Sequence, residues 1–259
     1  MTCFFVTLFL VIVIPYVGIP LLLRSKITLR SEPVLAPLAP EDLPADVVAH
    51  FAKAAQPLAT NEFEPVAYFS APDVPPGGFS FIAFWTSPKA QDLATVIVSM
   101  EGGTLPMTKQ TKTVHTDFYS VFDNGFRIVT SNDPRIPWTP AAPGQDVVQV
   151  MDVESPAVVY RLHSNRASRL MPAGAAKVLP AAGEEMAWFR GLVAERIRQQ
   201  QMAGYLEPGT TAGTSRLSMK GAFAMGASML PPVHQIRRWR VREKGEAQLK
   251  LARGSTKVH

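Results

Sequence analysis

The side chains that could carry out proton-transfer or metal chemistry are few in this chain of 259 residues, and they lie far apart. The only cysteine is Cys3, so no intrachain disulfide can form. A metal site needs histidine, cysteine or carboxylate groups close together. The five histidines are widely spaced, at His50, His115, His163, His234 and His259. This spacing predicts neither a metal site nor a bound cofactor.

One pair of chemically active residues is closer. His115 and Asp117 lie two residues apart in a run of strand-forming residues, where alternate side chains share one face of a sheet. A histidine beside a carboxylate can act as a general base that the carboxylate orients, and Tyr119 would share that face. The same pattern is typical of the half-exposed polar face of a sheet, which is the favoured interpretation. An enzyme with a site near His115, Asp117 and Tyr119 is the alternative.

The sequence contains none of the common motifs of catalysis or nucleotide binding. It has no Gly-x-Ser-x-Gly, no phosphate-binding glycine-rich loop that ends in Lys-Ser or Lys-Thr, no paired-histidine zinc motif and no dinucleotide fingerprint. We therefore predict no catalytic residue. The leading hypothesis is a membrane-anchored, non-enzymatic binding or scaffold module on the cytoplasmic face, with a protein partner or a homo-oligomer as open choices.

The elements that would position such a site begin with an apolar segment. Residues 3–23 carry no charge, and a helix of that length would reach roughly 30 Å, enough to cross a hydrocarbon core. No basic residue precedes the segment, and it is longer than a signal-peptide core, which favours a retained anchor. Because Arg24, Lys26 and Arg30 follow, the positive-inside rule predicts a single-pass cell-membrane protein whose N-terminus lies outside and whose domain is cytoplasmic. Residues 1–30 form this predicted transmembrane helix and its basic flank.

The central part of the chain predicts an α+β domain over residues 45–206, after a Pro-rich spacer over residues 31–44. Five short runs between residues 66 and 130 are rich in β-branched and aromatic residues, and Asp123-Asn124-Gly125 supplies a tight hairpin turn. Strands joined directly by turns predict an antiparallel meander of about five strands. Apolar residues at spacings of three and four predict helices packed with this sheet over residues 46–58, 156–169 and 184–203.

Residues 207–242 predict a C-terminal interfacial amphipathic helix. The uncharged run at 221–233 is too short to span a bilayer, and a basic cluster that includes a tryptophan follows it, a pattern typical of a helix on an anionic inner leaflet. The net charge of the chain is +5, and residues 216–259 hold ten Lys or Arg against two Glu. Residues 243–259 are predicted to be disordered. The predicted membrane-binding residues are Phe223, Met225, Met229, Leu230, Arg237, Arg238, Trp239 and Arg240.

A third hypothesis is membrane-tethered nucleic-acid binding through residues 196–242. The predicted helix at 184–203, the glycine-rich turn after it and the segment 215–221 superficially resemble the recognition helix and wing of a winged-helix DNA binder. The helix carries too little positive charge for that role. The basic segment lies beside an apolar helix, which favours lipid over nucleic acid.

The overall layout resembles a class of uncharacterised bacterial single-pass membrane-anchored proteins with a domain of unknown function. The residues that carry this resemblance are 116–132, 188–205 and 218–238. It implies an N-terminal anchor, an α+β domain with an aspartate/glycine hairpin, and an apolar segment that ends in basic residues. It implies no activity.

Overall fold

The computed structural model describes residues 14–72, 74, 78–101 and 111–255. The chain divides into two compact units, each built from segments that are distant in the sequence. Unit 1 comprises Met1–Glu32, Ile136–Ala142 and Leu192–Arg240, and unit 2 comprises Pro33–Arg135, Pro143–Gly191 and Val241–His259. Both units combine helices with strands, which confirms the predicted α+β class.

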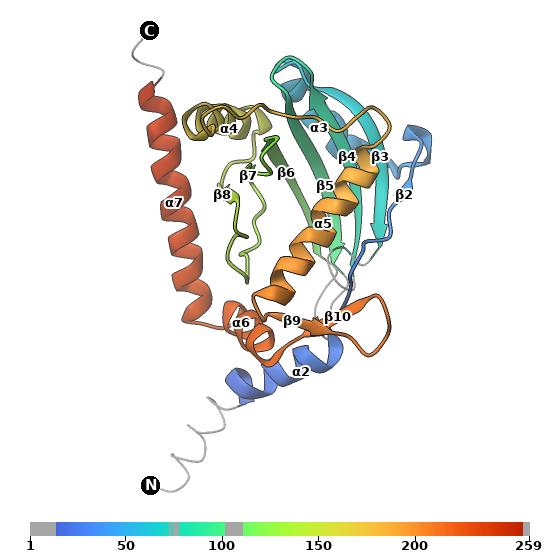
Figure 1. Ribbon diagram of the computed structural model, residues 1–259, viewed down its shortest axis with the longest axis vertical. Helices are drawn as coiled ribbons and strands as arrows, with labels where there is room; N and C mark the ends of the chain where they lie inside the picture. Colours follow the sequence, from blue (N-terminus) through green and yellow to red (C-terminus); the bar gives the residue numbers. More distant parts are fainter. Residues whose placement is uncertain (1–13, 73, 75–77, 102–110, 256–259) are drawn as a thin grey trace, which may run out of the picture. The chain divides into compact units, whose positions relative to one another are not determined.

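Unit 2 is built on a seven-stranded sheet in the order β2-β3-β4-β5-β6-β7-β8 (Figure 1). All neighbouring strands are antiparallel except β7 and β8, which are parallel. The strands are β2 Ala36–Pro37, β3 Glu64–Pro72, β4 Gly78–Ser87, β5 Asp92–Glu101, β6 Thr111–Val121, β7 Arg127–Ser131 and β8 Gln145–Gln149. The predicted meander is therefore corrected to a mixed sheet, because the connection after β7 is long enough to return β8 in the same direction.

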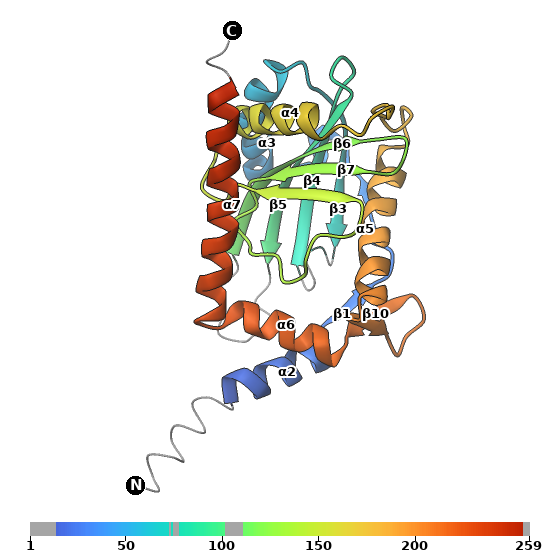
Figure 2. The ribbon, with the colours of Figure 1, turned by 60° about the vertical axis from the view of Figure 1, so that its left-hand side comes forward.

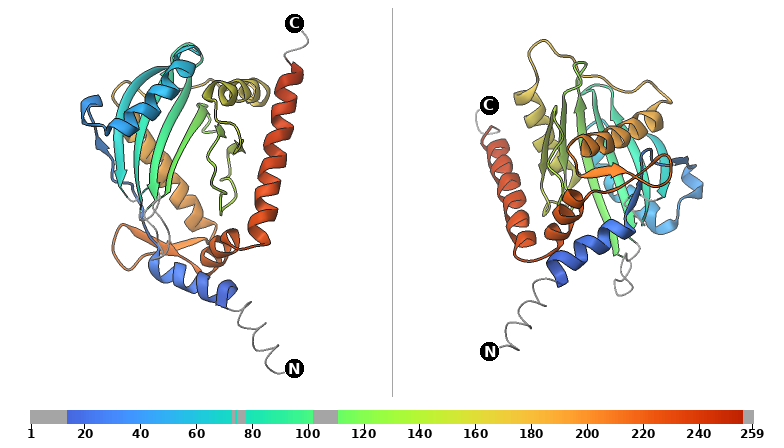
Figure 3. Two further views of the ribbon diagram at one scale, coloured as in Figure 1. Left: turned by 180° about the vertical axis from the view of Figure 1, so that it is seen from behind. Right: turned by 60° about the horizontal axis from the view of Figure 1, so that its bottom comes forward.

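Helices cover one face of this sheet in unit 2. The helices α3 Ala45–Ala59 and α4 Pro156–Leu170 pack against the strands, and their buried side chains form the main core (Figures 2 and 3). The inward residues of α3 recur at spacings of three and four, as an amphipathic helix requires. They are Val47, Phe51, Ala54 and Leu58.

The opposite face of the sheet carries the first turns of α5, Glu185–Met202. The ring of Trp188 lies 5.6 Å from that of Phe84, and the ring of Phe189 lies 5.4 Å from that of Phe69, measured between centroids. Ala83, the neighbour of Phe84 on β4, belongs to the core under α3 and α4. Successive side chains of a strand point to opposite faces, so the two faces have separate apolar contacts.

The hairpin between β6 and β7 forms as the sequence predicts. Gly125 has φ of +82° and donates its backbone N–H to the carbonyl of Phe122 at 2.9 Å. A side chain at that φ would be strained, so the turn needs glycine. Downstream, Val178 donates its N–H to the carbonyl of Val121 at 2.8 Å, which ties the segment after α4 to this hairpin.

Unit 1 contains a small antiparallel sheet in the order β1-β10-β9 and two packed helices. The strands are β1 Thr28–Arg30, β9 Leu206–Pro208 and β10 Thr214–Leu217. The helices are α2 Ile19–Lys26, preceded by a π-helical turn at Ile14–Gly18, and α6 Met219–Met229. Their core is apolar and consists of Leu23, Ile27, Ile197, Leu206, Leu217 and Ala222.

The predicted transmembrane anchor is wrong. Among the described residues, no helix combines the length and apolar character needed to cross a bilayer. The described part of the predicted span ends in α2, eight residues long, whose Leu23 is buried in the core of unit 1. β1 follows at once and pairs with β10. The predictions of a single-pass topology and a cell-membrane location are corrected with it; residues 1–13 of the predicted span lie outside the described residues.

The predicted disordered tail is also wrong over residues 243–255, which are helical. The helix α7 runs over Val233–Ser255. Lys244 Nζ donates to the carbonyl of Val147 at 2.9 Å, and Ala252 is buried in the core of unit 2. A Cβ at Gly245 would lie 2.5 Å from the carbonyl oxygen of Gln149, so the helix packs closely against the end of β8. Residues 256–259 lie outside the described residues.

The Pro-rich segment 31–44 is more than a spacer. It contributes β2 to the edge of the unit 2 sheet, and Leu38 donates its N–H to the carbonyl of Tyr68 at 2.9 Å. Proline is tolerated at such an edge because the edge strand has one unpaired side. The predicted single helix over residues 207–242 is corrected to several elements: the strands β9 and β10 come first, α6 ends at Met229, and α7 begins at Val233.

Candidate functional site

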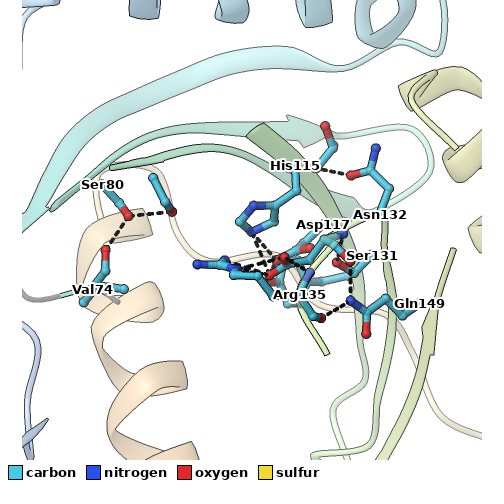
Figure 4. Close-up of polar contacts among 12 residues, drawn as sticks. Val74, Ser80, His115, Asp117, Ser131, Asn132, Arg135 and Gln149 are labelled. Atoms are coloured by element: carbon cyan, nitrogen blue, oxygen red, sulfur yellow. Dashed lines mark hydrogen bonds and ion pairs between the residues drawn. The ribbon is translucent and has the colours of Figure 1, made fainter. Parts of the chain in front are cut away.

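A polar cluster lies on the sheet face of unit 2 that also carries Phe84. Alternate residues of β6 place Thr113, His115 and Asp117 on this face. In the register of the sheet, Asp117 lies opposite Thr95 on β5 and opposite Ser131 on β7. Figure 4 shows His115 and Asp117 directed towards Arg135, which belongs to the segment that follows β7. The cluster thus joins two strands and one loop of the same unit.

His115 lies between two carboxylates. Its side chain is 3% exposed, and its Nε2 lies 3.9 Å from Asp117 Oδ2 and 3.7 Å from Asp133 Oδ2. Both distances exceed that of a hydrogen bond. The imidazole is therefore close to both carboxylates but is hydrogen-bonded to neither.

Asp133 is held by Arg135. Arg135 Nε lies 2.9 Å and 3.1 Å from the two carboxylate oxygens, and Nη2 lies 2.7 Å from Oδ2. Burial raises the pKa of Asp133, but the hydrogen bonds from Arg135 and the nearby His115 outweigh burial, so the pKa lies below its ordinary value. Asp133 is therefore ionised at neutral pH, and Arg135 neutralises its charge.

Asp117 is less completely satisfied. Its Oδ2 accepts a hydrogen bond from the hydroxyl of Tyr119 at 3.1 Å, while its Oδ1 is buried and has no hydrogen-bond partner among the described residues. The side chains of Asp117 and Asp133 are 15% and 21% exposed, and that of Arg135 is 33% exposed. Solvent therefore reaches the cluster on the side of these three residues.

Four buried polar atoms on this face have no partner within the described part of the chain. They are His115 Nδ1, Asp117 Oδ1, Thr95 Oγ1 and Thr113 Oγ1. A buried polar atom without a hydrogen bond costs about 1–3 kcal/mol, and such atoms are rare in native proteins. Four of them on neighbouring positions of β5 and β6 are the main observation at this site.

The loop after β7 is fixed by its own polar contacts. Ser131 Oγ accepts the N–H of Asp133 at 3.0 Å, and Gln149 Nε2 donates to the carbonyls of Asp133 and Arg135 (Figure 4). Asn132 Oδ1 accepts the N–H of Thr116 at 2.6 Å. The carboxylate of Asp133 is therefore held beside β6 by backbone and side-chain hydrogen bonds together.

A second polar cluster lies in the core under α4. Ser120 Oγ donates to Asp92 Oδ1 at 2.6 Å and lies 3.0 Å from His163 Nε2. Thr130 Oγ1 lies 3.0 Å from His163 Nδ1, and Lys177 Nζ lies 2.6 Å from Asp92 Oδ1. Although a serine, a histidine and an aspartate meet here, Ser120 bonds to the carboxylate and both ring nitrogens are engaged. This geometry is that of a satisfied core network.

Burial also sets the charge states in this network. His163 is completely buried, and burial lowers its pKa despite the hydrogen bond and charge of Asp92. Burial raises the pKa of Asp92, but the combined effect of His163, Lys177 and Ser120 is larger, so the pKa of Asp92 lies below its ordinary value. Burial and the nearby Asp92 charge raise the pKa of Tyr160. We assign this network a structural role, since Asp92 and His163 are almost inaccessible.

No group of three histidine, cysteine or acidic side chains is arranged to hold a metal ion in the part of the chain that the structure describes. The sequence predicted that His115, Asp117 and Tyr119 share one face, and the structure brings them together on β6. It adds Asp133, Arg135, Thr95 and Thr113, which no motif or spacing in the sequence links to His115.

The residues predicted to bind a membrane are all in unit 1 but differ in exposure. Phe223, Met229 and Trp239 are 40%, 53% and 60% exposed. Met225 packs against the core of unit 1, and Arg237 donates from Nη1 to the carbonyl of Trp138 at 3.3 Å. Leu230 is half-buried, while Arg238 and Arg240 are exposed.

No family model, curated protein or solved structure matches the chain. The resemblance to uncharacterised bacterial proteins therefore stays a prediction, and the functional argument depends on the geometry of the sheet face.

Proposed function

We propose that the chain is a binding module that holds a small polar molecule on the sheet face of unit 2. The sheet-face site is defined by Thr95, Thr113, His115 and Asp117. The observation that supports it is the set of four buried polar atoms on β5 and β6 that have no partner among the described residues. A ligand that forms hydrogen bonds with these atoms would remove the free-energy cost of leaving them unbonded.

The charges of the site favour a ligand that donates hydrogen bonds. The charge of Asp133 is neutralised by Arg135. Among the described residues, the carboxylate of Asp117 accepts a side-chain hydrogen bond only from the hydroxyl of Tyr119. A carboxylate oxygen accepts hydrogen bonds and attracts positive charge. A neutral or cationic molecule with N–H or O–H groups therefore fits the site better than an anion.

Catalysis by the same residues is the second candidate function. The favourable observation is the position of His115 between two carboxylates, which can orient a general base. However, no described serine, threonine or cysteine is hydrogen-bonded to His115, so the arrangement lacks an activated nucleophile of the usual kind. Binding is therefore proposed ahead of catalysis.

The test is a comparison of simple probes by thermal unfolding. Ethanolamine, glycerol and acetate represent a cation, a neutral polyol and an anion. A ligand that binds only the folded state raises the midpoint of unfolding as its concentration rises. We expect ethanolamine to raise the midpoint for the natural chain and to lose this effect in Asp117→Asn.

The matched control is Asp123→Asn, which removes a carboxylate from the hairpin turn of the same unit. This variant should keep the response to ethanolamine. Equal responses of Asp117→Asn and the natural chain, or no response to any of the three probes, would contradict the proposal.

A further inference from the structure

A second surface, in unit 1, has a different chemistry from the sheet-face site. The segments of unit 1 hold ten Lys or Arg against three Glu, which gives a formal charge of +7. The segments of unit 2 hold sixteen Lys or Arg against eighteen Asp or Glu, which gives −2. The positive charge of the whole chain therefore resides in unit 1, whose partners should be anionic.

The helices α2 and α6 of unit 1 lie side by side in antiparallel orientation (Figure 3). A Cβ at Gly226 would lie 2.7 Å from Pro20 Cγ, and Arg24 Nη1 lies 3.3 Å from Met219 Sδ. Tyr16 also donates its hydroxyl to the carbonyl of Pro231. The helix α2 therefore packs against α6, and Tyr16, which precedes α2, contacts the segment between α6 and α7.

Apolar side chains are exposed along these helices. Leu21 and Leu22 on α2 are 45% and 41% exposed, and Phe223 on α6 is 40% exposed. At the start of α7, Ile236 and Trp239 are 47% and 60% exposed. Large apolar side chains that gather on one small unit usually mark an interaction site.

Exposed cations accompany these apolar residues. Arg24 and Arg216 share the carboxylate of Glu207. By contrast, Lys26, Arg238 and Arg240 are exposed, and no ion pair joins them to a carboxylate of the described residues. Their charges are available to an anionic partner.

We propose that unit 1 docks on an anionic lipid surface. Nucleic acid could bind the same cations, but the exposed leucines would stay in contact with water. A lipid surface binds cations through its anionic headgroups and also buries apolar side chains. Such docking needs no helix that spans the bilayer. The unit 1 surface is defined by Leu21, Leu22, Phe223, Arg238, Trp239 and Arg240.

The experiment is co-sedimentation of the full chain with two kinds of vesicle. One is phosphatidylcholine alone, and the other is an equimolar mixture of phosphatidylcholine and phosphatidylserine. We expect the chain to bind the mixed vesicles more tightly, and added salt to weaken that binding. The double variant Arg238→Glu/Arg240→Glu should lower affinity for mixed vesicles at least about tenfold, because each basic residue near such a surface adds about 1 kcal/mol.

The matched control is Lys250→Glu/Arg253→Glu, which reverses two exposed charges on the same helix but within unit 2. It should lower the affinity by much less than the unit 1 variant. Leu21→Gln should also weaken binding, because it removes an exposed apolar side chain. Equal affinity for both vesicles, or equal effects of the two double variants, would overturn the proposal, as would salt-sensitive binding of a DNA oligonucleotide without vesicle binding.

Discussion

At the scale of single residues, the sheet-face site depends on how its charges are compensated. Arg135 contacts Asp133 through two nitrogens, and the backbone N–H of Arg135 adds a third contact at 2.9 Å. This pairing leaves Asp117 as the carboxylate that is available for a ligand. The availability of Asp117 for a ligand therefore depends on Arg135, which lies outside the strands.

The first prediction concerns the Asp133–Arg135 pair. Arg135→Ala should lower the free energy of unfolding at pH 7 by about 1–2 kcal/mol, since the half-buried Asp133 loses its partner while some water still reaches it. In the folded state the pKa of Asp133 is below its ordinary value of 3.8. The pair therefore stabilises the folded state fully above about pH 3.8, and this contribution is lost as the pH falls through the lower pKa of the folded state. Urea unfolding at pH 7 and pH 3 would measure both effects.

The control for this prediction is Lys89→Ala, which removes an exposed pair with Glu62. That variant should change stability by less than about 1 kcal/mol. A cost for Arg135→Ala that is as small as that of the control, or that is unchanged in acid, would show that the pair does not hold the loop.

The second prediction concerns His163 in the core network. Burial lowers the pKa of His163 from its ordinary value of 6.5, so the unfolded chain binds a proton more readily than the folded one. The natural chain should therefore lose stability as the pH falls through about 6.5. His163→Gln should be less stable at pH 8, and its deficit relative to the natural chain should shrink by pH 5.5. A deficit that stays constant over this range would contradict a neutral, buried His163.

At the scale of elements, two helical glycines distinguish a tight contact from a free surface. A Cβ at Gly245 on α7 would lie 2.5 Å from the carbonyl oxygen of Gln149, whereas a Cβ at Gly191 on α5 would meet no atom of the described residues within 4 Å. Alanine is a better helix former than glycine by about 1 kcal/mol. The same substitution should therefore have opposite effects at these two positions.

The third prediction uses this matched pair. Gly191→Ala should stabilise the chain by about 0.5–1 kcal/mol. Gly245→Ala should destabilise it by about 1–3 kcal/mol, because the methyl group would push α7 away from the backbone of β8. Chemical unfolding of both variants would test the contact, and a stabilising effect at Gly245 would show that α7 does not pack closely there.

The elements that the sequence predicts well have strong local signals. The helix at Ala45–Ala59 has a clear apolar stripe, and the hairpin at Asp123-Asn124-Gly125 needs a positive φ. By contrast, β8 is five residues long and has two adjacent valines between polar residues, and α7 is rich in charge over residues 242–253. These elements form because they pack on distant segments, which local periodicity does not report.

The site is predicted from the sequence in part. The period of a strand puts His115, Asp117 and Tyr119 on one face, as the structure confirms. Asp133 and Arg135 come from an irregular loop whose place beside β6 depends on Gln149. No spacing rule links those two residues to His115, so the second carboxylate was not predicted.

At the scale of the whole molecule, the two units differ in both charge and structure. The N-terminal residues from Ile14 to Arg30 belong to unit 1, where Leu23 is buried and β1 pairs with β10. A hydrophobic stretch at a terminus is thus used partly for packing within this unit. Its length alone did not distinguish that use from a span across a bilayer.

The fourth prediction tests the internal packing of unit 1. Gly226→Val should separate α6 from α2, because a Cβ at Gly226 would already lie 2.7 Å from Pro20 Cγ. Hydrogen exchange followed by mass spectrometry should show faster exchange in Ile19–Lys26 and Met219–Met229. Exchange in β4 and β5 of unit 2 serves as the internal reference and should stay slow. Unchanged exchange in the two helices would show that they do not depend on this contact.

The central claim is that the sheet-face site binds a polar molecule that donates hydrogen bonds. The most direct measurement is NMR of the His115 imidazole, assigned with His115→Gln, during titration with ethanolamine and with acetate. We predict saturable shifts of the His115 ring resonances with ethanolamine, weaker or absent shifts with acetate, and loss of the ethanolamine response in Asp117→Asn. Ring resonances that stay unchanged with both probes would contradict the account.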